Sequence, residues 1–282
     1  MSGMDHKAQA PLVLSKALLE SIRLLAQKAG EAAMGYYGDA NAMGVQVKGD
    51  ATPVTAADKA AHQVIVDGLM ELTPSVPILS EEDEHQVPWG ERSQWYQYWL
   101  IDPLDGTKEF IHGNGEFTVN IALIQAQAPV LGVVYAPALG LSYCGAESVS
   151  AYKVLASGES LSLPQTADVP SETRVLSSRS HPSPALSAYL ERLTNPVSVP
   201  VGSSLKLCYL TDGQGDLYPR LGPTSEWDIA AGQAVVGACG GQVRVLDEHK
   251  NPSHPLGYNQ SDSLLNPEFV AYLNPNKLPK SE

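Results

Sequence analysis

Acidic side chains follow directly after an apolar stretch near the middle of the chain. Asp102 and Asp105 lie three residues apart around a proline, and an aspartate followed by Gly106 is typical of a tight turn. Pro103 fixes its own φ angle and removes one hydrogen-bond donor. Such a turn can direct both carboxylates and the Leu104 carbonyl at one point. Three oxygen ligands of this kind suit a hard cation such as magnesium.

Two further acidic segments stand where predicted elements begin or end. Glu81, Glu82 and Asp83 follow a short apolar stretch, and Asp228 lies in the first turn of a predicted helix. Each segment alone has an ordinary explanation: a plain turn at 102–106, a solvated acidic loop at 81–83, and a helix acid favoured by the dipole. The combination, with few basic residues beside it, favours one shared metal site.

The residues that follow the turn can bind an anion. The backbone N–H groups of Gly106 and Thr107 could hold a phosphate, as at a helix N-terminus or an N–H nest. The sequence has no histidine or cysteine motif suited to a covalent phosphoenzyme. Metal-assisted attack by water is therefore the chemistry that these residues favour.

The elements that must position these side chains fall into two halves. Residues 11–156 begin with an amphipathic helix over about 18–36 and a second helix that Thr55 caps, with Asp58 three residues on. Short strands then predict an antiparallel sheet, at 76–79, 96–101, 118–124, 130–135, 141–144 and 151–154.

The second half, residues 157–282, alternates strands and helices. We expect strands at 174–177, 197–201, 216–218 and 242–246, and helices at 185–193, 204–211 and 227–238. The polar stretch 157–173 is the predicted boundary, and the tail after Pro267 predicts no element. The fold class is α/β, with an α+β N-terminal half and an α/β C-terminal half.

The composition limits which partners the protein can bind and indicates its cellular compartment. The 282 residues are 43% apolar and carry a formal charge of −13, which disfavours nucleic-acid polymers because the chain would repel their phosphates. Three cysteines without metal or redox spacing indicate reduced thiols. No stretch predicts an integral membrane segment. We expect a cytoplasmic protein, leave peripheral attachment at the inner face of the membrane open, and find no sign of oligomeric state.

Four segments together resemble the inositol monophosphatase superfamily. Trp99–Phe110 is similar to its metal-binding signature, Glu226–Gly232 to its second signature, and Pro53–Asp58 and Ser80–Asp83 to two further elements, all in the family's order. The resemblance implies a layered αβαβα sandwich of the inositol monophosphatase and sugar phosphatase type.

Further residues resemble one subfamily. Gly106-Thr107-Lys108-Glu109-Phe110 and the segment 115–120 look like the 3'(2'),5'-bisphosphate nucleotidases of the CysQ type. That resemblance implies magnesium-dependent hydrolysis of the 3'-phosphate of adenosine 3',5'-bisphosphate to AMP and phosphate, a place in sulfur metabolism, and inhibition by lithium. Segment 202–206 is similar to its nucleotide-contacting region, and segment 178–181 to another of its stretches.

The resemblance also assigns roles. Glu81, Asp102 and the Leu104 carbonyl would bind a first magnesium ion, and Asp102, Asp105 and Asp228 a second; family members often engage a third. The choice of Glu81 over Glu82 rests on the resemblance. Asp58 and Thr107 would orient and deprotonate the attacking water. The substrate would contact Glu81, Leu104, Asp105, Gly106, Thr107, Gly202, Ser203, Ser204, Lys206 and Asp228.

Several alternatives stay open. Lys206 either supplies a point charge to the second phosphate or is a solvated surface lysine. His181 has no settled role. The chain could instead be an inositol or sugar phosphatase on the same scaffold, or a non-catalytic metal- or lithium-binding sensor. Lys108-Glu109 disfavours the former, and the Asp58–Thr107 pair disfavours the latter, because a sensor needs no base.

Overall fold

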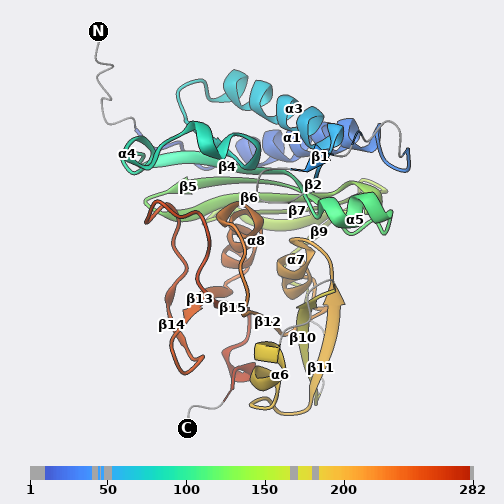
Figure 1. Cartoon of the computed structure of the whole chain (residues 1–282), viewed down its shortest axis with the longest axis vertical. Coiled ribbons are helices and arrows are strands. Elements are labelled where there is room, and N and C mark those ends of the chain that lie inside the picture. The colour runs from blue at the N-terminus through green and yellow to red at the C-terminus, as the bar shows by residue number, and fades with distance from the viewer. Residues whose placement is uncertain are drawn as a thin grey trace.

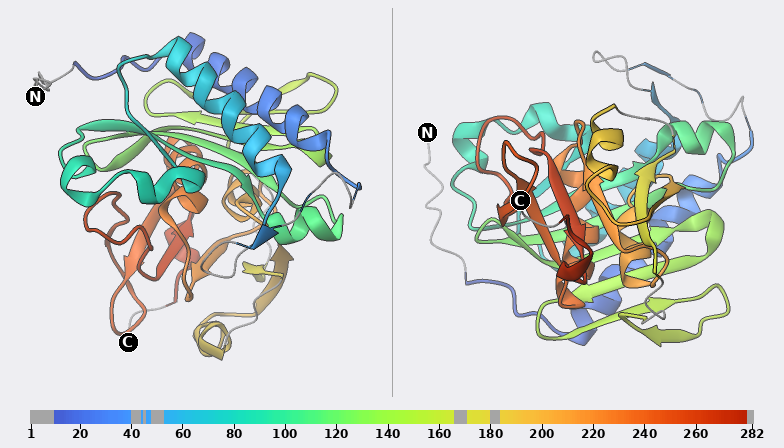
Figure 2. Two further views of the ribbon diagram at one scale, coloured as in Figure 1. Left: turned by 45° about the horizontal axis from the view of Figure 1, so that its top comes forward. Right: turned by 90° about the horizontal axis from the view of Figure 1, so that it is seen from below.

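The structure is a computed structural model that describes residues 10–39, 44, 46–47, 53–165, 171–179 and 184–279. In this part of the chain, helices and two large β-sheets alternate in five layers, beside a small separate sheet of two strands (Figure 1, Figure 2). From one end to the other the layers are helices, sheet, helices, sheet and helix. The predicted layered α/β sandwich is therefore confirmed. His181 and Ser180 lie outside the described residues.

The first sheet has seven strands in the described part of the chain, in the order β3-β4-β5-β6-β7-β8-β9. Its strands are antiparallel except for the parallel pair of β3 and β4. The bounds are β3 (Ile78–Ser80), β4 (Gln97–Asp105), β5 (Thr118–Gln125), β6 (Ala128–Ala136), β7 (Leu141–Ala146), β8 (Ser150–Val154) and β9 (Ser160–Ser162).

Strand β4 is buried on both faces of this sheet. Trp99 and Ile101 pack on one side against α1 (Lys16–Met34) and α3 (Ala56–Leu72). Tyr98 and Leu100 pack on the other side, toward the second sheet. Successive side chains of a strand point to opposite faces, so an unbroken apolar run fits a strand covered on both sides. The last residues of β4, including both aspartates, therefore lie at the edge of the hydrophobic core.

Helix α8 (Glu226–Ala238) lies between the two sheets (Figure 1). It rests on two glycines of the first sheet. A Cβ atom at Gly132 would lie 2.2 Å from the Ala231 oxygen, and one at Gly145 would lie 2.6 Å from the Val235 Cα atom. A side chain at either position would push the helix away. This close contact fixes where the first turn of α8 lies relative to the ends of the strands.

The second sheet has six strands among the described residues, in the order β11-β10-β12-β15-β13-β14. Its strands are β10 (Thr173–Ser178), β11 (Pro196–Val201), β12 (Leu217–Arg220), β13 (Gln242–Leu246), β14 (Pro252–Pro255) and β15 (Phe269–Tyr272). The sequence after Pro267 carried no readable signal, and the structure forms strand β15 there. Strand β15 is fully buried between β12 and β13, but four apolar residues have no readable period before their partners are known.

Short helices complete the molecule. Helix α6 (Pro184–Leu190) covers the outer face of the second sheet, and α7 (Leu205–Thr211) packs beside α8. The remaining elements are β1 (Gln46–Val47), β2 (Pro53–Val54), α4 (Trp89–Arg92), α5 (Thr107–His112), and the 3₁₀ turns η1 (Glu81–Gln86), η2 (Pro137–Leu139) and η3 (Pro275–Lys277).

The boundary between the two halves lies near the last strand of the first sheet. Strand β9 pairs with β8, so the first sheet continues past residue 156, and β10 opens the second sheet at Thr173. The division at 156/157 stays a prediction. None of the helices in the described part of the chain has both the length and the apolar character needed to cross a membrane.

Candidate metal centre

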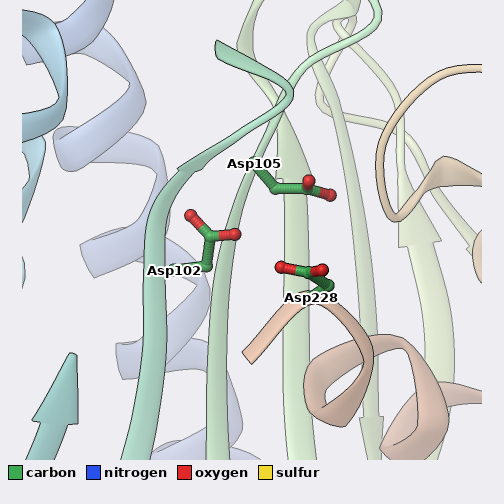
Figure 3. Close-up of side chains that lie close together, drawn as sticks. All are labelled: Asp102, Asp105 and Asp228. Atoms are coloured by element: carbon green, nitrogen blue, oxygen red, sulfur yellow. The ribbon is translucent and has the colours of Figure 1, made fainter. Parts of the chain in front are cut away.

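Three carboxylates from two distant segments meet where β4 ends. Asp102 and Asp105 lie at the end of β4, and Asp228 is in the first turn of α8. Figure 3 shows the three side chains directed toward one another. One carboxylate oxygen from each lies within 4.8 Å of those of the other two. This convergence of segments 123 residues apart is the geometry that the sequence predicted (228 − 105 = 123).

The local sequence explains how β4 delivers two acids to one side. The register with β5 shifts between Asp102 and Asp105, and Pro103 stands in this irregular stretch, where a missing N–H is tolerated. The Asp102 Oδ1 atom accepts a hydrogen bond from Leu104 N at 3.0 Å. Gly106 then turns the chain at φ 89°, a left-handed conformation that favours glycine. The predicted turn at Gly106 is therefore present. It occurs together with the convergence of the three carboxylates, so the plain turn and the shared site are not alternatives.

Burial and mutual repulsion act together on these carboxyls. Burial is the main cause that raises the pKa of Asp102 well above its usual value, and the charges of Glu81, Asp105 and Asp228 raise it further. Burial also raises the pKa of Asp228 well above the usual value, with Asp105 the next cause. Buried like charges are costly unless a cation neutralises them. An all-oxygen donor set of this charge fits a hard divalent ion.

Glu81 lies beside the three aspartates, and its role as a ligand in preference to Glu82 stays a prediction. Glu81 lines the same cavity as the three aspartates, and its charge raises the pKa of Asp102. The charge of Glu82 instead contributes to raising the pKa of Asp58. Ser80 caps the turn η1 by accepting from Glu82 N at 3.2 Å. The structure thus separates two neighbouring acids that spacing alone could not distinguish.

Asp58 and Thr107 approach each other beside the cluster. The Thr107 hydroxyl lies 3.4 Å from Asp58 Oδ1 and 3.4 Å from the Leu104 oxygen. The other oxygen of Asp58 accepts from Thr55 N at 2.7 Å and from the Thr55 hydroxyl at 2.6 Å, as the predicted capping box requires. Burial raises the pKa of Asp58 above its usual value, and the bonds from Thr55 oppose that shift.

A cavity of about 240 Å³ opens in front of the carboxylates. Every site residue predicted from the sequence lines it, apart from Asp58, which lies behind Thr107. Another wall comes from the segment 202–206, which belongs to the second half of the chain and touches the acidic cluster through Ser204. The cavity therefore lies between the acidic end of β4 and the loop that precedes α7.

Lys206 in the wall formed by segment 202–206 is buried, so the alternative of a solvated surface lysine is wrong. Its ammonium donates to the Val201 oxygen at 3.2 Å and to the Ser203 oxygen at 2.5 Å, and it lies 5.6 Å from the centre of the Tyr218 ring. Burial lowers the pKa of Lys206 to about 8, with the charge of Asp105 opposing that shift. The lysine is a desolvated cation beside the acidic cluster.

Two other groups at the site were not predicted from the sequence. Arg220, at the end of β12, lines the cavity, and its guanidinium donates to the Gly222 and Pro223 oxygens. Its charge opposes the rise in the pKa of Asp228. Asn120 on β5 is buried and contacts the Ser204 hydroxyl. The contact of Asn120 with Ser204 joins segments far apart in the chain, so local spacing does not predict it. The only available signal for Arg220 was its position at the end of a short apolar strand.

A salt bridge fastens the wall formed by segment 202–206 to the first half of the chain. Arg179 forms a bidentate pair with Glu116, at 2.7 and 2.9 Å, and also donates to the Pro200 oxygen. Glu116 in turn accepts from Gly202 N at 2.8 Å. Gly202 has no room for a side chain there, since a Cβ would lie 2.8 Å from the Glu116 Cβ atom. The loop before α7 is thus held at a fixed distance from the turn at Gly106.

Known proteins are similar to this chain in sequence and in fold. Residues 16–274 match the model of the inositol monophosphatase family. The chain is 48% identical over 252 residues to the 3'(2'),5'-bisphosphate nucleotidase CysQ of Escherichia coli K12, covering 89% of this chain and 98% of the relative. It is 42% identical over 227 residues to the protein of the same name from Buchnera aphidicola, covering 80% of this chain and 84% of the relative.

Solved structures agree with this similarity. The crystal structure of CysQ from Bacteroides thetaiotaomicron matches with a TM-score of 0.79 and 36% identity, covering 94% of this chain and all of that one. An IMPase from Thermotoga maritima matches with a TM-score of 0.69 and 26% identity, covering 91% of this chain and 92% of that one. The resemblance inferred from the motifs is confirmed, and the chain belongs to the inositol monophosphatase family.

Proposed function

We propose that this protein is a magnesium-dependent phosphatase that removes the 3'-phosphate of adenosine 3',5'-bisphosphate, yielding AMP and phosphate. The observation that carries the proposal is the convergence of Asp102, Asp105 and Asp228, whose oxygens lie within 4.8 Å of one another. Such a cluster has a use only if cations occupy it. The names of the relatives, bisphosphate nucleotidases of the CysQ type, support the choice of substrate.

The chain's own residues fit two magnesium ions. Glu81, Asp102 and the Leu104 oxygen would hold one, and Asp102, Asp105 and Asp228 the other; a third ion could bind more weakly. When bound, magnesium supplies Lewis acidity, which makes water a better nucleophile and stabilises charge on the attacking and leaving oxygens. The carboxylates would fix the positions of the magnesium ions. Gly106 and Thr107 line the adjoining wall, where the phosphate would lie.

Asp58 and Thr107 can move the proton of the attacking water. The Thr107 hydroxyl points at Asp58 Oδ1, so Thr107 can pass its own proton to that carboxylate while it accepts one from the water. The bonds from Thr55 occupy the other carboxylate oxygen and set the orientation of Asp58. The 3.4 Å separation is long, as is common for catalytic contacts before substrate binds.

The cations that line the cavity suit a second phosphate. Lys206 and Arg220 both line it, beside the acidic cluster, on the wall formed by the segment 202–206 and the end of β12. Their charges offset the acids and would attract an anionic substrate. We assign the second phosphate and the nucleoside to this wall, with Gly202, Ser203 and Lys206 as the proposed contacts. A substrate with a single phosphate and no base would leave this wall unused.

A phosphate-release assay tests the proposal. Adenosine 3',5'-bisphosphate, inositol 1-phosphate and fructose 1,6-bisphosphate are compared at equal concentration, with magnesium and with a chelator, and with lithium added to a further set. We expect the highest kcat/KM for the nucleotide, no release under the chelator, and inhibition by lithium. A preference for inositol or sugar phosphate would favour the sugar phosphatase alternative. Absence of release from all three substrates would favour the metal-binding sensor.

We also propose a cytoplasmic location. The three cysteines of the chain are free thiols, and Cys144 and Cys208 are buried. Free thiols are usual in reducing compartments. Fractionation of cells into soluble and membrane fractions, before and after a high-salt wash, tests this proposal and the possibility of peripheral attachment at the inner face of the membrane. Recovery of the protein in the membrane fraction after the salt wash would contradict both.

A further inference from the structure

Ser204 connects the metal-binding segments of the two halves. Its backbone N–H and its hydroxyl both lie 2.6 Å from Asp105 Oδ2. The same hydroxyl lies 2.5 Å from the backbone oxygen of Asp228. Ser204 is buried, and it lines the cavity beside these two segments. One serine thus contacts two of the three converging aspartates, which come from β4 and α8.

The number of hydrogens at this hydroxyl limits how it can bond. A serine hydroxyl has one hydrogen to donate and lone pairs that accept. Two acceptors, Asp105 Oδ2 and the Asp228 oxygen, compete for that hydrogen, so a shared three-centre bond is the arrangement that satisfies both short contacts. The backbone N–H of Ser204 serves Asp105 in either case. The hydroxyl therefore adds the link between Asp105 and α8.

Asn120 completes the arrangement from β5. Its side chain is 1% exposed, and its Nδ2 atom donates to the Ser204 hydroxyl at 2.8 Å. That donated hydrogen occupies a lone pair of the serine and leaves the hydroxyl hydrogen for the aspartates. The carbonyl oxygen of Asn120 has no hydrogen-bond partner in the described part of the chain. The hydrogen bond from the Asn120 amide thus orients the Ser204 hydroxyl.

These bonds fix which oxygen of Asp105 faces the other acids. Asp105 Oδ2 accepts from Ser204 N and Oγ and, at 3.5 Å, from Thr118. Among the described residues no hydrogen bond reaches Asp105 Oδ1, which leaves that atom for a cation. Groups that orient a ligand in this way strengthen metal binding, and their loss typically weakens it about 10–100-fold.

We infer that Ser204 and Asn120 are positioning residues for the metal site, which hold Asp105 and Asp228 in the arrangement that binds the second cation. The inference rests on the proposed function, since it needs a bound metal. It reassigns Ser204, which the sequence resemblance places among the substrate contacts, because both its N–H and its hydroxyl already bond to protein. A positioning role changes metal affinity, whereas a substrate contact changes KM for the nucleotide.

Metal affinity is measured directly by titrating the protein with Mn²⁺ and following the EPR signal of the free ion. Wild type is compared with Ser204→Ala, Asn120→Ala and the double variant. We expect Kd for Mn²⁺ to rise about tenfold or more in each single variant. The double variant should lose no more than Ser204→Ala alone, because Asn120 acts through Ser204. The matched control is Ser142→Ala, a buried serine on β7 outside the cavity, which should bind Mn²⁺ as wild type does.

Steady-state kinetics on the same variants separates the two roles. With saturating magnesium we expect KM for the nucleotide to stay within about twofold of wild type, while the magnesium concentration for half-maximal rate rises in parallel with Kd. An unchanged Kd in both single variants, or a raised KM with unchanged Kd, would overturn the inference. If wild type itself fails to bind Mn²⁺, the proposed function falls. If wild type binds and the variants bind equally well, only the inference falls.

Discussion

Helices α3 and α8 begin with the same local motif but face different chemistry. Each starts with a capping box in which the third helical residue is an aspartate: Asp58 accepts from Thr55 N at 2.7 Å, and Asp228 from Ser225 N at 3.0 Å. Asp58 then meets the hydroxyl of Thr107, whereas Asp228 meets two other carboxylates. One arrangement suits a base and the other a metal ligand.

The difference shows what a cap motif decides. The cap fixes the direction of each carboxylate relative to its own helix. What lies opposite depends on the packing of that helix. Helix α3 lies on the outer face of the first sheet, and α8 lies between the sheets against the end of β4 (Figure 2). The same short sequence pattern therefore serves two roles, and each can be tested against the other.

Replacing Asp228 should have the largest effect. Asp228→Asn keeps the shape of the side chain but removes a charge that the proposed second metal needs. We expect kcat to fall about 10³-fold, because metal-ion stabilisation contributes several kcal/mol, and Mn²⁺ affinity to fall with it. The assays are phosphate release and Mn²⁺ titration. Wild-type affinity in this variant would show that Asp228 is only a helix cap.

Asp58→Asn is the matched variant at the other capping box. Loss of a general base should lower kcat by about 10²–10³-fold, while Mn²⁺ affinity stays near that of wild type. Thr107→Val should give a similar loss, since Asp58 acts through that hydroxyl. Parallel loss of metal affinity in Asp58→Asn would contradict the distinction between the two helices.

Replacing Lys206 tests the wall formed by segment 202–206, and here a smaller effect is expected. Lys206→Met should raise KM for the nucleotide about tenfold, since one hydrogen bond to a charged group contributes about 1.5–3 kcal/mol. The ammonium is charged below its pKa of about 8 and neutral above it, so KM for wild type should rise as pH increases through 8. Profiles of kcat/KM between pH 6.5 and 9.5 check both points. The rise should be absent in the variant; its persistence would assign the titration to another group.

The smallest expected effect is the rise in stability when magnesium binds. Measured in Asp58→Asn and Asp228→Asn, it compares the two capping aspartates again. At magnesium about 100 times Kd, mass action adds about 2.7 kcal/mol to the free energy of unfolding, which shifts Tm by roughly 5–10 °C. Melting curves with magnesium, against a sodium control of equal ionic strength, measure it. The shift should persist in Asp58→Asn and shrink in Asp228→Asn. Equal shifts in both would contradict an assembled cluster at Asp228.

Much of the fold and of the candidate site could be predicted from the sequence. Short motifs carry their own local geometry: the Asp-Pro-Leu-Asp-Gly turn, the Thr55 capping box and the amphipathic helices all appear where expected. These features depend on backbone angles, hydrogen bonds within a few residues and the period of apolar side chains. The resemblance of four such motifs to one family then predicted the layered fold.

Other features became visible only in the folded chain. Strand β15 has no signal of its own, and its burial follows from pairing with β12 and β13. The choice between Glu81 and Glu82 depends on which one faces the cavity. Burial of Lys206 depends on segments such as β12, whose Tyr218 lies over its ammonium.

The sequence by itself determined which residues could do chemistry here and how each is held within its own turn or helix. The tertiary structure decided which of them meet. Asp105 and Asp228 share a cation site because α8 packs against the end of β4, and Ser204 and Asn120 join them from two further segments. Contacts between distant segments leave no trace in local spacing, since loop closure and packing, rather than backbone preference, bring them together.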